Sequence, residues 1–558
     1  MGLFEDALGV IGAGIQIFEN VQKTFFKASS SNAPLQTRGG AMDGVGTRTP
    51  RNLKSYQPAL AGPDSELAYD LPDARVKCRD LYFNTTDGKN TVDTTIDYVV
   101  GKGLRPQVAM DWEVITEYLT AYLKWEPKQI ENYRERINKK IMRRWRKWSE
   151  SKSADIQGQH NFPTIQRLTL KSMLHSGEVF PVINHCKHKG KVKVQIGLIE
   201  TDRVANPMKN FTENNVDGLI CDDKGKPIAI NVRCSRENVS GFEYKLIPFE
   251  YSNGRPAVLH LFEPDRPGQH RGVPQLTSII ERIKNLDTLV KNELNAGKLN
   301  SFLALLIESG DPQFLESLSE EQRRNYLDYF TDPANKPNEI AMESGTMMQM
   351  MPGEKAVPFD PKRPNTAYGP FARDMRSEIS MAMGIPNNMY RKEFSSSYSA
   401  ARGEMNMYKK PVSYKAQFME LGFCATVWRE WMIDEVLSDE IDLVGFFHSE
   451  DLMDAYCGSV WSHEPIGQID ETKEADASEK RTDLGQSTMA EETAAMTGND
   501  YETTLEQLAR EKDLRFKLGI PTEKDMKQDE FMRRLEAEEL KKKAEALKNA
   551  DTTSTPST

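Results

Sequence analysis

The clearest pattern of apolar and polar positions lies between residues 260 and 386. Proline suits the first turn of a helix, where its missing N–H is not needed, and Pro274 opens such a pattern. No further proline occurs until Pro312, which leaves room for one long helix. Its apolar residues recur at helical spacing: Ile279, Ile280, Ile283, Leu286, Leu289, Val290 and Leu294.

A second stripe predicts a second helix, with Phe371, Met375, Ile379 and Met383 at i, i+4 steps. It ends at Gly384-Ile385-Pro386, a glycine stop followed by proline. Residues 301–364 lie between the two helices and predict a small α/β insert. Its expected elements are a charged helix at Glu320–Tyr329 and a strand pair at Met347–Met351 and Ala356–Phe359.

Residues 387–399 follow the second helix and are polar, which predicts a flexible loop. They contain Arg391, Lys392 and Glu393 and then Ser395, Ser396 and Ser397. A long helix is expected from there to about Leu437, kinked or broken at Pro411. We interpret its apolar stripe as core: Tyr408, Phe418, Leu421, Val427, Trp428, Trp431 and Met432.

The part of the chain before residue 260 combines helices with short strands. Val192, Val194 and Ile196 alternate with polar residues, the period of a half-buried strand. The turn 222–225 separates apolar runs at 219–221 and 228–232, and further strands are expected at 242–251 and 257–263. Sequential short strands without βαβ units predict an antiparallel meander and an α+β fold.

Composition narrows the classes of protein. The 558 residues suffice for several domains, and the net charge of −10 gives no overall basic surface for tight nucleic-acid binding. Six scattered cysteines without a CxxC motif indicate free thiols in a reducing compartment. Residues 185–188, His-Cys-Lys-His, lack a second ligand pair and are interpreted as a hairpin turn. The apolar N-terminus carries Glu5 and Asp6 and predicts neither a signal peptide nor a membrane span.

Residues 126–150 are strongly basic, with Tyr133, Trp145 and Trp148 interleaved. Three interpretations remain open: a nucleic-acid contact, a solvated helix face with both tryptophans in the core, and salt bridges between subunits. The cations are Lys128, Arg134, Arg136, Lys139, Lys140, Arg143, Arg144, Arg146 and Lys147.

Several motifs occur in the order known from one family. They are an arginine-bearing helix at 73–81 with a turn at Asn84, Val-Val-Gly-Lys-Gly at 99–103, Asp-Arg-x-x-Asn-Pro at 202–207, RPGQHRGVP at 266–274, PGEKAVPFDPKRP at 352–364, ISMAMGIP at 379–386, and Trp461 to Glu474. In this order they resemble the lambda-type portal proteins of tailed phages, the head–tail connectors. One departure is Glu471, which stands where the family has a proline.

The resemblance implies a portal fold with a β-rich wing, two stem helices around an α/β clip, a kinked long helix and a helical crown. The implied divisions are an N-terminal arm (1–65), partly disordered; wing (66–265); first stem helix (266–300); clip (301–364); second stem helix (365–386); tunnel loop (387–399); long helix returning to the wing (400–465); crown (466–550); and disordered tail (551–558).

The resemblance also implies a function. Copies of the chain would form a ring, a homododecamer, at one capsid vertex, through which a separate terminase packages double-stranded DNA that later leaves through the tail. The implied partners are the terminase large subunit, a head–tail adaptor, the major capsid and scaffolding proteins, and DNA in transit. The protein would be made in the host cytoplasm and would carry no cofactor and no membrane-integrated segment.

Three groups of candidate site residues follow from the resemblance. The tunnel loop contributes Arg391, Lys392, Glu393, Ser395, Ser396 and Ser397. The stem contributes Ile283, Leu286, Val290, Gly297, Phe371, Met375 and Ile379. The clip would dock partners through Glu320, Glu321, Arg323 and Arg324. Gly297 either admits a neighbouring helix or marks a helix end.

No phosphate-binding loop, H-E-x-x-H or G-x-S-x-G motif occurs in the sequence, so we expect neither ATP hydrolysis nor another enzymatic activity. Two alternatives remain: a DNA-processing enzyme, suggested by the basic stretch, and a membrane-associated pore, suggested by the apolar N-terminus. Images of rings in detergent-free buffer would support the portal alone.

Overall fold

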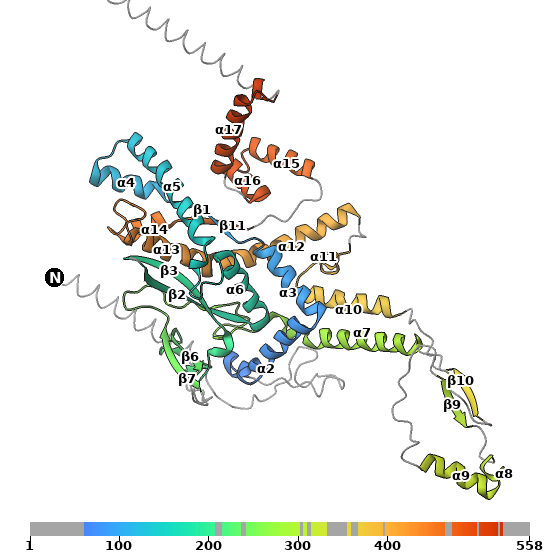
Figure 1. Cartoon of the computed structure of the whole chain (residues 1–558). Helices are drawn as coiled ribbons and strands as arrows, with labels where there is room; N and C mark the ends of the chain where they lie inside the picture. Colours follow the sequence, from blue (N-terminus) through green and yellow to red (C-terminus); the bar gives the residue numbers. More distant parts are fainter. Residues whose placement is uncertain are drawn as a thin grey trace, which may run out of the picture.

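The computed structural model mixes helices with antiparallel sheets (Figure 1). It describes residues 61–188, 190–206, 215–235, 242–301, 305–309, 314–331, 354–358, 367–393, 397–463, 471–498, 501–522 and 525–527. The predicted tail and most of the predicted arm lie outside these ranges. The first helix begins at Pro63, slightly before the predicted boundary of the wing.

Five helices come before the first long strand: α2 (Pro63–Asn84), α3 (Thr86–Val99), α4 (Trp112–Leu123), α5 (Pro127–Ser149) and α6 (Phe162–Ser176). Their starts follow the local sequence. The Thr85 side chain caps α3 by accepting a hydrogen bond from the Gly88 N–H, and Asn161 caps α6 in the same way through Thr164. Helix α6 ends at Gly177, whose φ of 90° favours glycine.

Two antiparallel sheets confirm the predicted meander. In the first, β2 (Glu178–His188) pairs with β3 (Lys191–Ile199) on one edge and with β8 (Leu261–Phe262) on the other. The second has the order β4 (Asn215–Val216), β5 (Leu219–Cys221), β6 (Pro227–Ser235) and β7 (Phe242–Pro248). The last strands are shorter than predicted, since β7 ends at Pro248 and β8 has two residues. The single turns η3 (Lys152–Ala154) and η4 (Thr201–Arg203) flank this region.

The long helix was predicted to be kinked or broken at Pro411, and it is not broken there. Helix α12 (Tyr398–Met419) runs through Pro411 without a break, and the irregularity lies at a π-helical segment, η6 (Glu420–Cys424), before α13 (Ala425–Leu437). Tyr408 and Val412 are buried on either side of the proline, so packing holds this turn helical despite the lost hydrogen bond.

An aromatic core explains both the stripe of the long helix and the tryptophans of α5. Trp145 lies 4.9 Å from Trp428 and 5.1 Å from Trp431 between ring centroids. Trp145 and Trp148 are both buried, which confirms that α5 docks through its tryptophans. Leu421 is 65% exposed, so its assignment to the core was wrong.

The C-terminal part is helical, as predicted for residues after 470. Helix α14 (Glu450–Cys457) leads into β11 (Ser459–Ser462), which pairs with β1 (Arg105–Val108) from the other end of the chain. Helices α15 (Glu471–Asp483), α16 (Met489–Thr497) and α17 (Tyr501–Lys517) follow.

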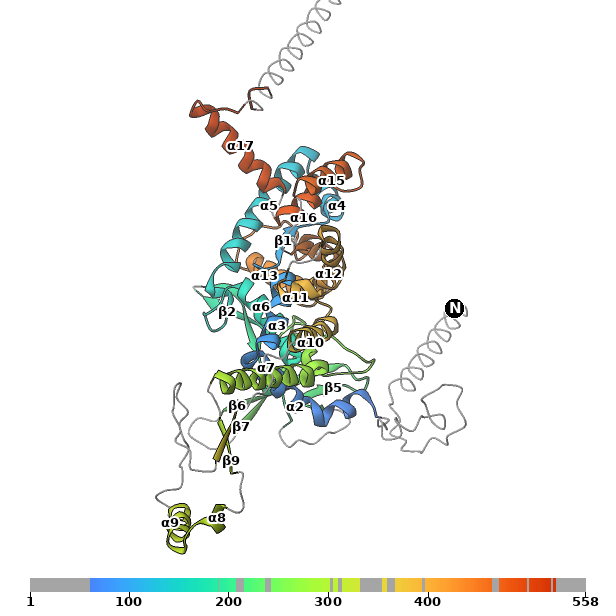
Figure 2. The same cartoon turned by 90° about the vertical axis from the view of Figure 1, so that its right-hand side faces the viewer.

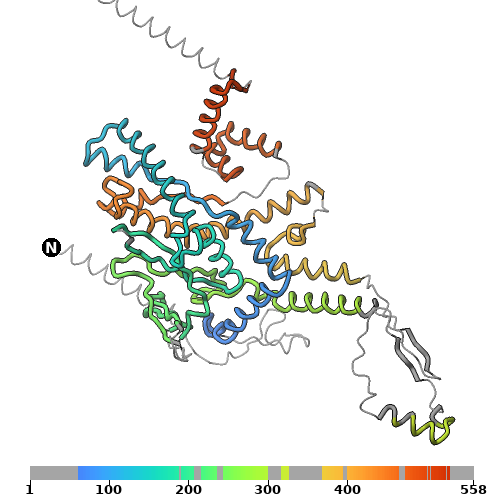
Figure 3. Tube along the Cα trace, in the orientation of Figure 1, coloured from blue at the N-terminus to red at the C-terminus, as the bar shows by residue number. Residues whose placement is uncertain are grey.

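The middle of the chain leaves this body and returns to it (Figure 3). The short turn η5 (Gln275–Ile279) and α7 (Ile280–Ser301) lead outward, and α10 (Tyr368–Ala382) and α11 (Asn387–Arg391) lead back. Between them come β9 (Leu305–Ser309), α8 (Phe314–Ser317), α9 (Glu320–Thr331) and β10 (Glu354–Pro358). Figures 1 and 2 show α7 and α10 side by side, with α8 and α9 at the far end.

Candidate functional site

The paired helices α7 and α10 are the candidate stem. Ile283 and Leu286 of α7 and Ile379 of α10 are buried in the main core, and Val290 and Met375 pack against it. Arg282 Nε and Glu378 Oε2 join the two helices at 2.9 Å. These contacts occupy the predicted stripes, because residues three and four apart share one helix face.

Two of the predicted stem residues stand apart from that packing. The Phe371 side chain is 54% exposed. Gly297 lies four residues before the end of α7, and a Cβ built there would meet no atom within 4 Å. Among the described residues, neither side-chain position is buried by the rest of the chain.

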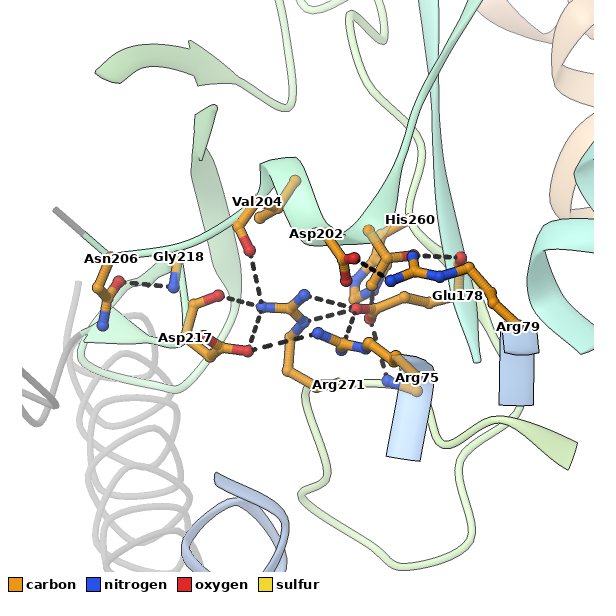
Figure 4. A network of polar contacts seen from close by, with 12 residues as sticks. Arg75, Arg79, Glu178, Asp202, Val204, Asn206, Asp217, Gly218, His260 and Arg271 are labelled. Carbon is orange, nitrogen blue, oxygen red and sulfur yellow. Dashed lines mark hydrogen bonds and ion pairs between the residues drawn. The ribbon is translucent and has the colours of Figure 1, made fainter. Parts of the chain in front are cut away.

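A buried ionic network holds the start of the candidate stem (Figure 4). Glu178, the first residue of β2, is fully buried and accepts four hydrogen bonds at its two carboxylate oxygens. Arg75 Nη2 of α2 and Arg271 Nε each donate to Oε1 at 2.7 Å. His260 Nε2 and the Gly272 backbone N–H donate to Oε2 at 2.8 and 3.0 Å.

The same network extends to the edge of the second sheet. Arg271 Nη1 donates to Asp217 Oδ2 at 2.8 Å and to the Asp217 carbonyl oxygen. Asp202 accepts from Arg79, one turn beyond Arg75 on α2. Asn206 Oδ1 accepts the Gly218 N–H at 2.6 Å, which orders the turn beside Asp217. Three of the motifs that carried the family resemblance therefore meet at one place.

Electrostatics explain why a carboxylate is tolerated there. Burial alone would raise the pKa of Glu178, but the guanidinium groups of Arg271 and Arg75 hold that pKa well below its usual range. Burial and the neighbouring Arg271 lower the pKa of Arg75 to about 10, so it stays cationic at neutral pH. Burial also lowers the pKa of His260, whose ring stacks between Phe180 and Phe262 at 4.4 and 4.5 Å. His260 is therefore a neutral donor to Glu178.

Close backbone contact reinforces this anchor. The chain at Gly177, just before β2, touches the chain at Gly272, just before η5. A Cβ at Gly177 would lie 2.4 Å from the Gly272 carbonyl oxygen, and one at Gly272 would lie 2.3 Å from the Gly177 oxygen. Only glycine fits such an approach, so two backbones and one carboxylate fix where η5 and α7 leave the body.

The predicted tunnel loop is more ordered than expected. Residues 387–391 form α11, Lys392 adopts a left-handed conformation with φ 57°, and Ser397 caps α12 by accepting the Ala400 N–H. Tyr390 is buried, and its hydroxyl donates to Asp87 Oδ1 of α3 at 3.0 Å. The flexible loop was therefore a wrong prediction for 387–391. The helix forms because Pro386 precedes it and Tyr390 anchors it.

The polar residues of this segment have different surroundings. Arg391 pairs with Glu393, which offsets its charge. Lys392 lines a polar cavity of about 460 Å³ together with residues of α2 and α3, among them Lys89 and Asp93. Ser395 and Ser396 lie outside the described residues.

The insert between the stem helices contains the predicted charged helix. Glu320, Glu321, Arg323 and Arg324 lie on α9, all exposed. One strand of the predicted pair is observed as β10, and it pairs with β9, which was not predicted, from Glu354 opposite Ser309 to Pro358 opposite Leu305. Residues 347–351, expected as the partner strand, lie outside the described part. The strand β9 was missed because its apolar run continues directly from the helix pattern of α7.

Membrane-spanning helices and metal-ligand clusters are both absent from the part of the chain that the structure describes. None of the described helices is long and apolar enough to cross a bilayer. No group of His, Cys, Asp and Glu among those residues has the arrangement of a metal site. His185, from the motif considered for metal, donates to or accepts from Asp434 at 2.8 Å near Arg255, as part of a second ionic cluster.

Comparison with known proteins identifies the class. The model of the family described as phage portal protein, lambda family, matches residues 49–414, well over half of the chain. The chain therefore belongs to the lambda family of phage portal proteins. Its role is that of a portal, the channel component of a phage head, which is a structural part of the virion and not an enzyme.

Individual portal proteins match this chain in sequence along more than half of their own length. Portal protein B of Escherichia phage lambda is 21% identical over 477 residues, which cover 82% of this chain and 87% of the relative. The portal protein of Escherichia phage N15 is 22% identical over 486 residues, which cover 84% of this chain and 89% of the relative. A probable portal protein of Halomonas phage phiHAP-1 is 24% identical over 284 residues, covering 48% and 52%.

Solved structures give a weaker global likeness. A chain from the neck of an empty GTA particle, with C6 symmetry, is 14% identical at a TM-score of 0.38, covering 74% of this chain and 93% of that one. A chain from the virion of a native gene transfer agent particle is 12% identical at a TM-score of 0.36, and the match covers 75% of this chain and 92% of that one. These scores are too low for a comparison of single elements.

The buried network was not predicted from the sequence, although the position of Arg75 on its helix was a signal of it. Arg75 occupies the buried face of α2, in line with Leu71, Cys78 and Tyr82. A cation at a core position of an amphipathic helix requires a buried anion, because an unpaired charge there is very costly. Which carboxylate it meets depends on folding, since Glu178 is 103 residues away.

Proposed function

We propose that copies of this chain close into a ring, a dodecamer as the family resemblance implies, at one vertex of the capsid. Membership of the portal family over residues 49–414 carries this proposal. Double-stranded DNA enters through the ring, driven by a separate terminase, and leaves through it into the tail. The divisions into wing, stem, clip, tunnel segment and crown belong to this proposal, with the boundaries given above.

The charge of the chain supports a conduit. A wall that neutralises many phosphates would release their counterions and hold the duplex tightly. DNA that has to slide in both directions needs weak contacts, and the net charge of −10 fits that need. In the tunnel segment the cation of Arg391 is offset by Glu393, which leaves Lys392 as its exposed cation among the described residues.

The ring itself is tested by negative-stain imaging of the purified full chain in detergent-free buffer. We expect closed rings with a central channel. A monodisperse monomer, or particles that form only in detergent, would contradict the proposal and favour the enzyme or the membrane pore.

The clip is proposed to dock the terminase large subunit during packaging and the head–tail adaptor afterwards. Its support is the position of α9, which lies at the far end of the paired stem helices with four exposed charges (Figure 1). Deletion of residues 311–338 should abolish binding of the terminase large subunit in a pull-down while rings persist. Retained binding would place the dock elsewhere. The major capsid and scaffolding proteins are proposed to surround the wing, and the chain is proposed to be made in the host cytoplasm.

A further inference from the structure

One helix of the body carries a face of positive charge that neither the core nor the proposed channel uses. The buried side of α5 is apolar and packs through Ile137, Ile141 and Trp145. The opposite side carries cations at i, i+3, i+4 and i+7 spacing, which aligns them along the helix. We call this set the basic face of α5: Lys128, Arg136, Lys139, Lys140, Arg143, Arg146 and Lys147.

The basic face is left largely unpaired within the chain. Among the described residues, Lys139 is its one member with an ion pair, to Glu506 of α17 at 2.5 Å. Arg144, at the edge of the apolar side, instead joins Glu435 and Glu440. Cations of this face three and four residues apart repel one another, and Glu131 and Glu135 near its N-terminal half offset only part of that charge. A bound polyanion would remove that repulsion, whereas solvent alone only screens it.

The composition of the face points to nucleic acid and not to protein. Protein interfaces are anchored by aromatic and apolar side chains, and lysine is depleted from them. The cations of the basic face have no apolar side chain among them, whereas α2 and α12 expose such residues, for example Tyr69, Phe83 and Met407. Interfaces with DNA are far more positively charged and depend on phosphate contacts.

We propose that the basic face of α5 binds the sugar–phosphate backbone of double-stranded DNA without reading its sequence. Lys and Arg side chains spaced along one helix can neutralise successive phosphates, and phosphate contacts position a duplex without reading its sequence. In both views α5 lies beside α17, at the end of the molecule away from α8 and α9 (Figures 1 and 2).

The location of this site rests on the proposed function. If α9 faces the terminase outside the head, the basic face of α5 faces the packaged genome inside it. The channel segment at Lys392 lies elsewhere, next to α3. The chain would thus separate two kinds of contact: weak contacts where DNA slides and stronger contacts where DNA is stored.

The test measures binding of a fluorescein-labelled 30-base-pair duplex to the purified full chain by anisotropy, across a series of salt concentrations. The variant Arg143→Gln/Arg146→Gln/Lys147→Gln removes three exposed charges that have no ion pair among the described residues. Its affinity should fall at least about tenfold at 0.1 M salt, and the slope of log K against log salt should shrink by up to about 2.7, since each phosphate contact contributes about 0.9.

The matched control, Lys224→Gln/Lys226→Gln/Lys245→Gln, removes the same charge from the β5–β6 turn and from β7 and should change affinity far less. An equal loss in both variants would show a net-charge effect and overturn the proposal, as would unchanged binding in the α5 variant. If the α5 variant keeps DNA affinity but loses its rings by mass photometry, the basic face is a subunit contact and the proposal is wrong. If the wild type forms no rings, the proposed function is contradicted. The DNA-binding site is still supported in that case, provided that the α5 variant loses DNA binding and the control variant does not.

Discussion

At the scale of single residues, Glu178 decides how the stem meets the body. It satisfies two arginines, one histidine and one backbone N–H from three separate stretches of chain. A buried ion pair contributes little net stability over an apolar substitute, but removing one partner leaves the other charges buried and incompletely paired. The network therefore acts mainly as a specificity device that fixes one orientation of the stem.

Replacing Glu178 tests that role. Glu178→Gln leaves the buried Arg75 and Arg271 with Asp217 as their one shared carboxylate among the described residues, so we expect a loss of about 3 kcal/mol in the free energy of unfolding, measured with urea. The control is Glu200→Gln, which breaks the largely exposed pair with Arg79 and should cost no more than about 1 kcal/mol. Equal effects of the two substitutions would show that the network does not anchor the stem.

His175 should make stability depend on pH. Burial, together with the nearby cations Arg79 and Lys171, lowers the pKa of this side chain in the last turn of α6 to about 4. An unfolded chain binds the same proton at about 6.5. Between these values only the unfolded state is protonated, so stability is fully present above pH 6.5 and falls as the pH drops toward 4.

The size of this effect is at most about 3 kcal/mol, from 1.36 kcal/mol per pKa unit. The measurement is the free energy of unfolding of wild type and His175→Gln at pH 7.5, 6 and 5. The variant should lose less stability on acidification than the wild type does. The exposed His448, replaced by Gln, provides the comparison; parallel pH curves for wild type and His175→Gln would refute the assignment.

At the scale of elements, periodicity predicted most helices and the antiparallel meander, because an amphipathic pattern is local. It failed where packing overrides propensity. Pro411 stays inside α12 since Tyr408 and Val412 hold that turn, and residues 387–391 become helical because Tyr390 is anchored on α3. The pairing of β9 with β10 joins segments some fifty residues apart, which local patterns do not encode.

Gly297 is where one element is expected to meet the next subunit. Glycine costs about 1 kcal/mol in a helix relative to alanine, and among the described residues a Cβ built at Gly297 would meet nothing within 4 Å beyond its own helix. Gly297→Leu should therefore impair ring formation while circular dichroism shows unchanged helix content. Gly297→Ala, which adds a single methyl group, is the control and should retain more rings. Light scattering that shows normal rings for Gly297→Leu would exclude close packing at this position.

At the scale of the whole molecule, the body, the paired helices α7 and α10, and the distant α9 each have a different role. The aromatic core around Trp145 and Trp428 gives the rigid part. The network at Glu178 fixes the direction in which α7 leaves it, and α9 lies where a partner can reach it (Figure 1). A ring built from such subunits places the segment 387–399, which follows the second stem helix, toward its axis in our proposal.

The last prediction concerns that segment. It is held at one end by Tyr390 on α3 and at the other by the capped start of α12, and we propose that the residues between these anchors face the channel. Serine hydroxyls give weak, exchangeable contacts to phosphate, and the pair of Arg391 with Glu393 limits the charge. Removing Ser395 and Ser396, while keeping Ser397 as the helix cap, should leave rings intact but stall packaging or let packaged DNA leak. The measurement is nuclease-resistant DNA per particle.

Ser395→Ala/Ser396→Ala keeps the length of the segment, and a smaller defect in that variant would assign the effect to length and not to hydroxyl groups. Full DNA retention and normal infectivity after the deletion would reduce the segment to a connector.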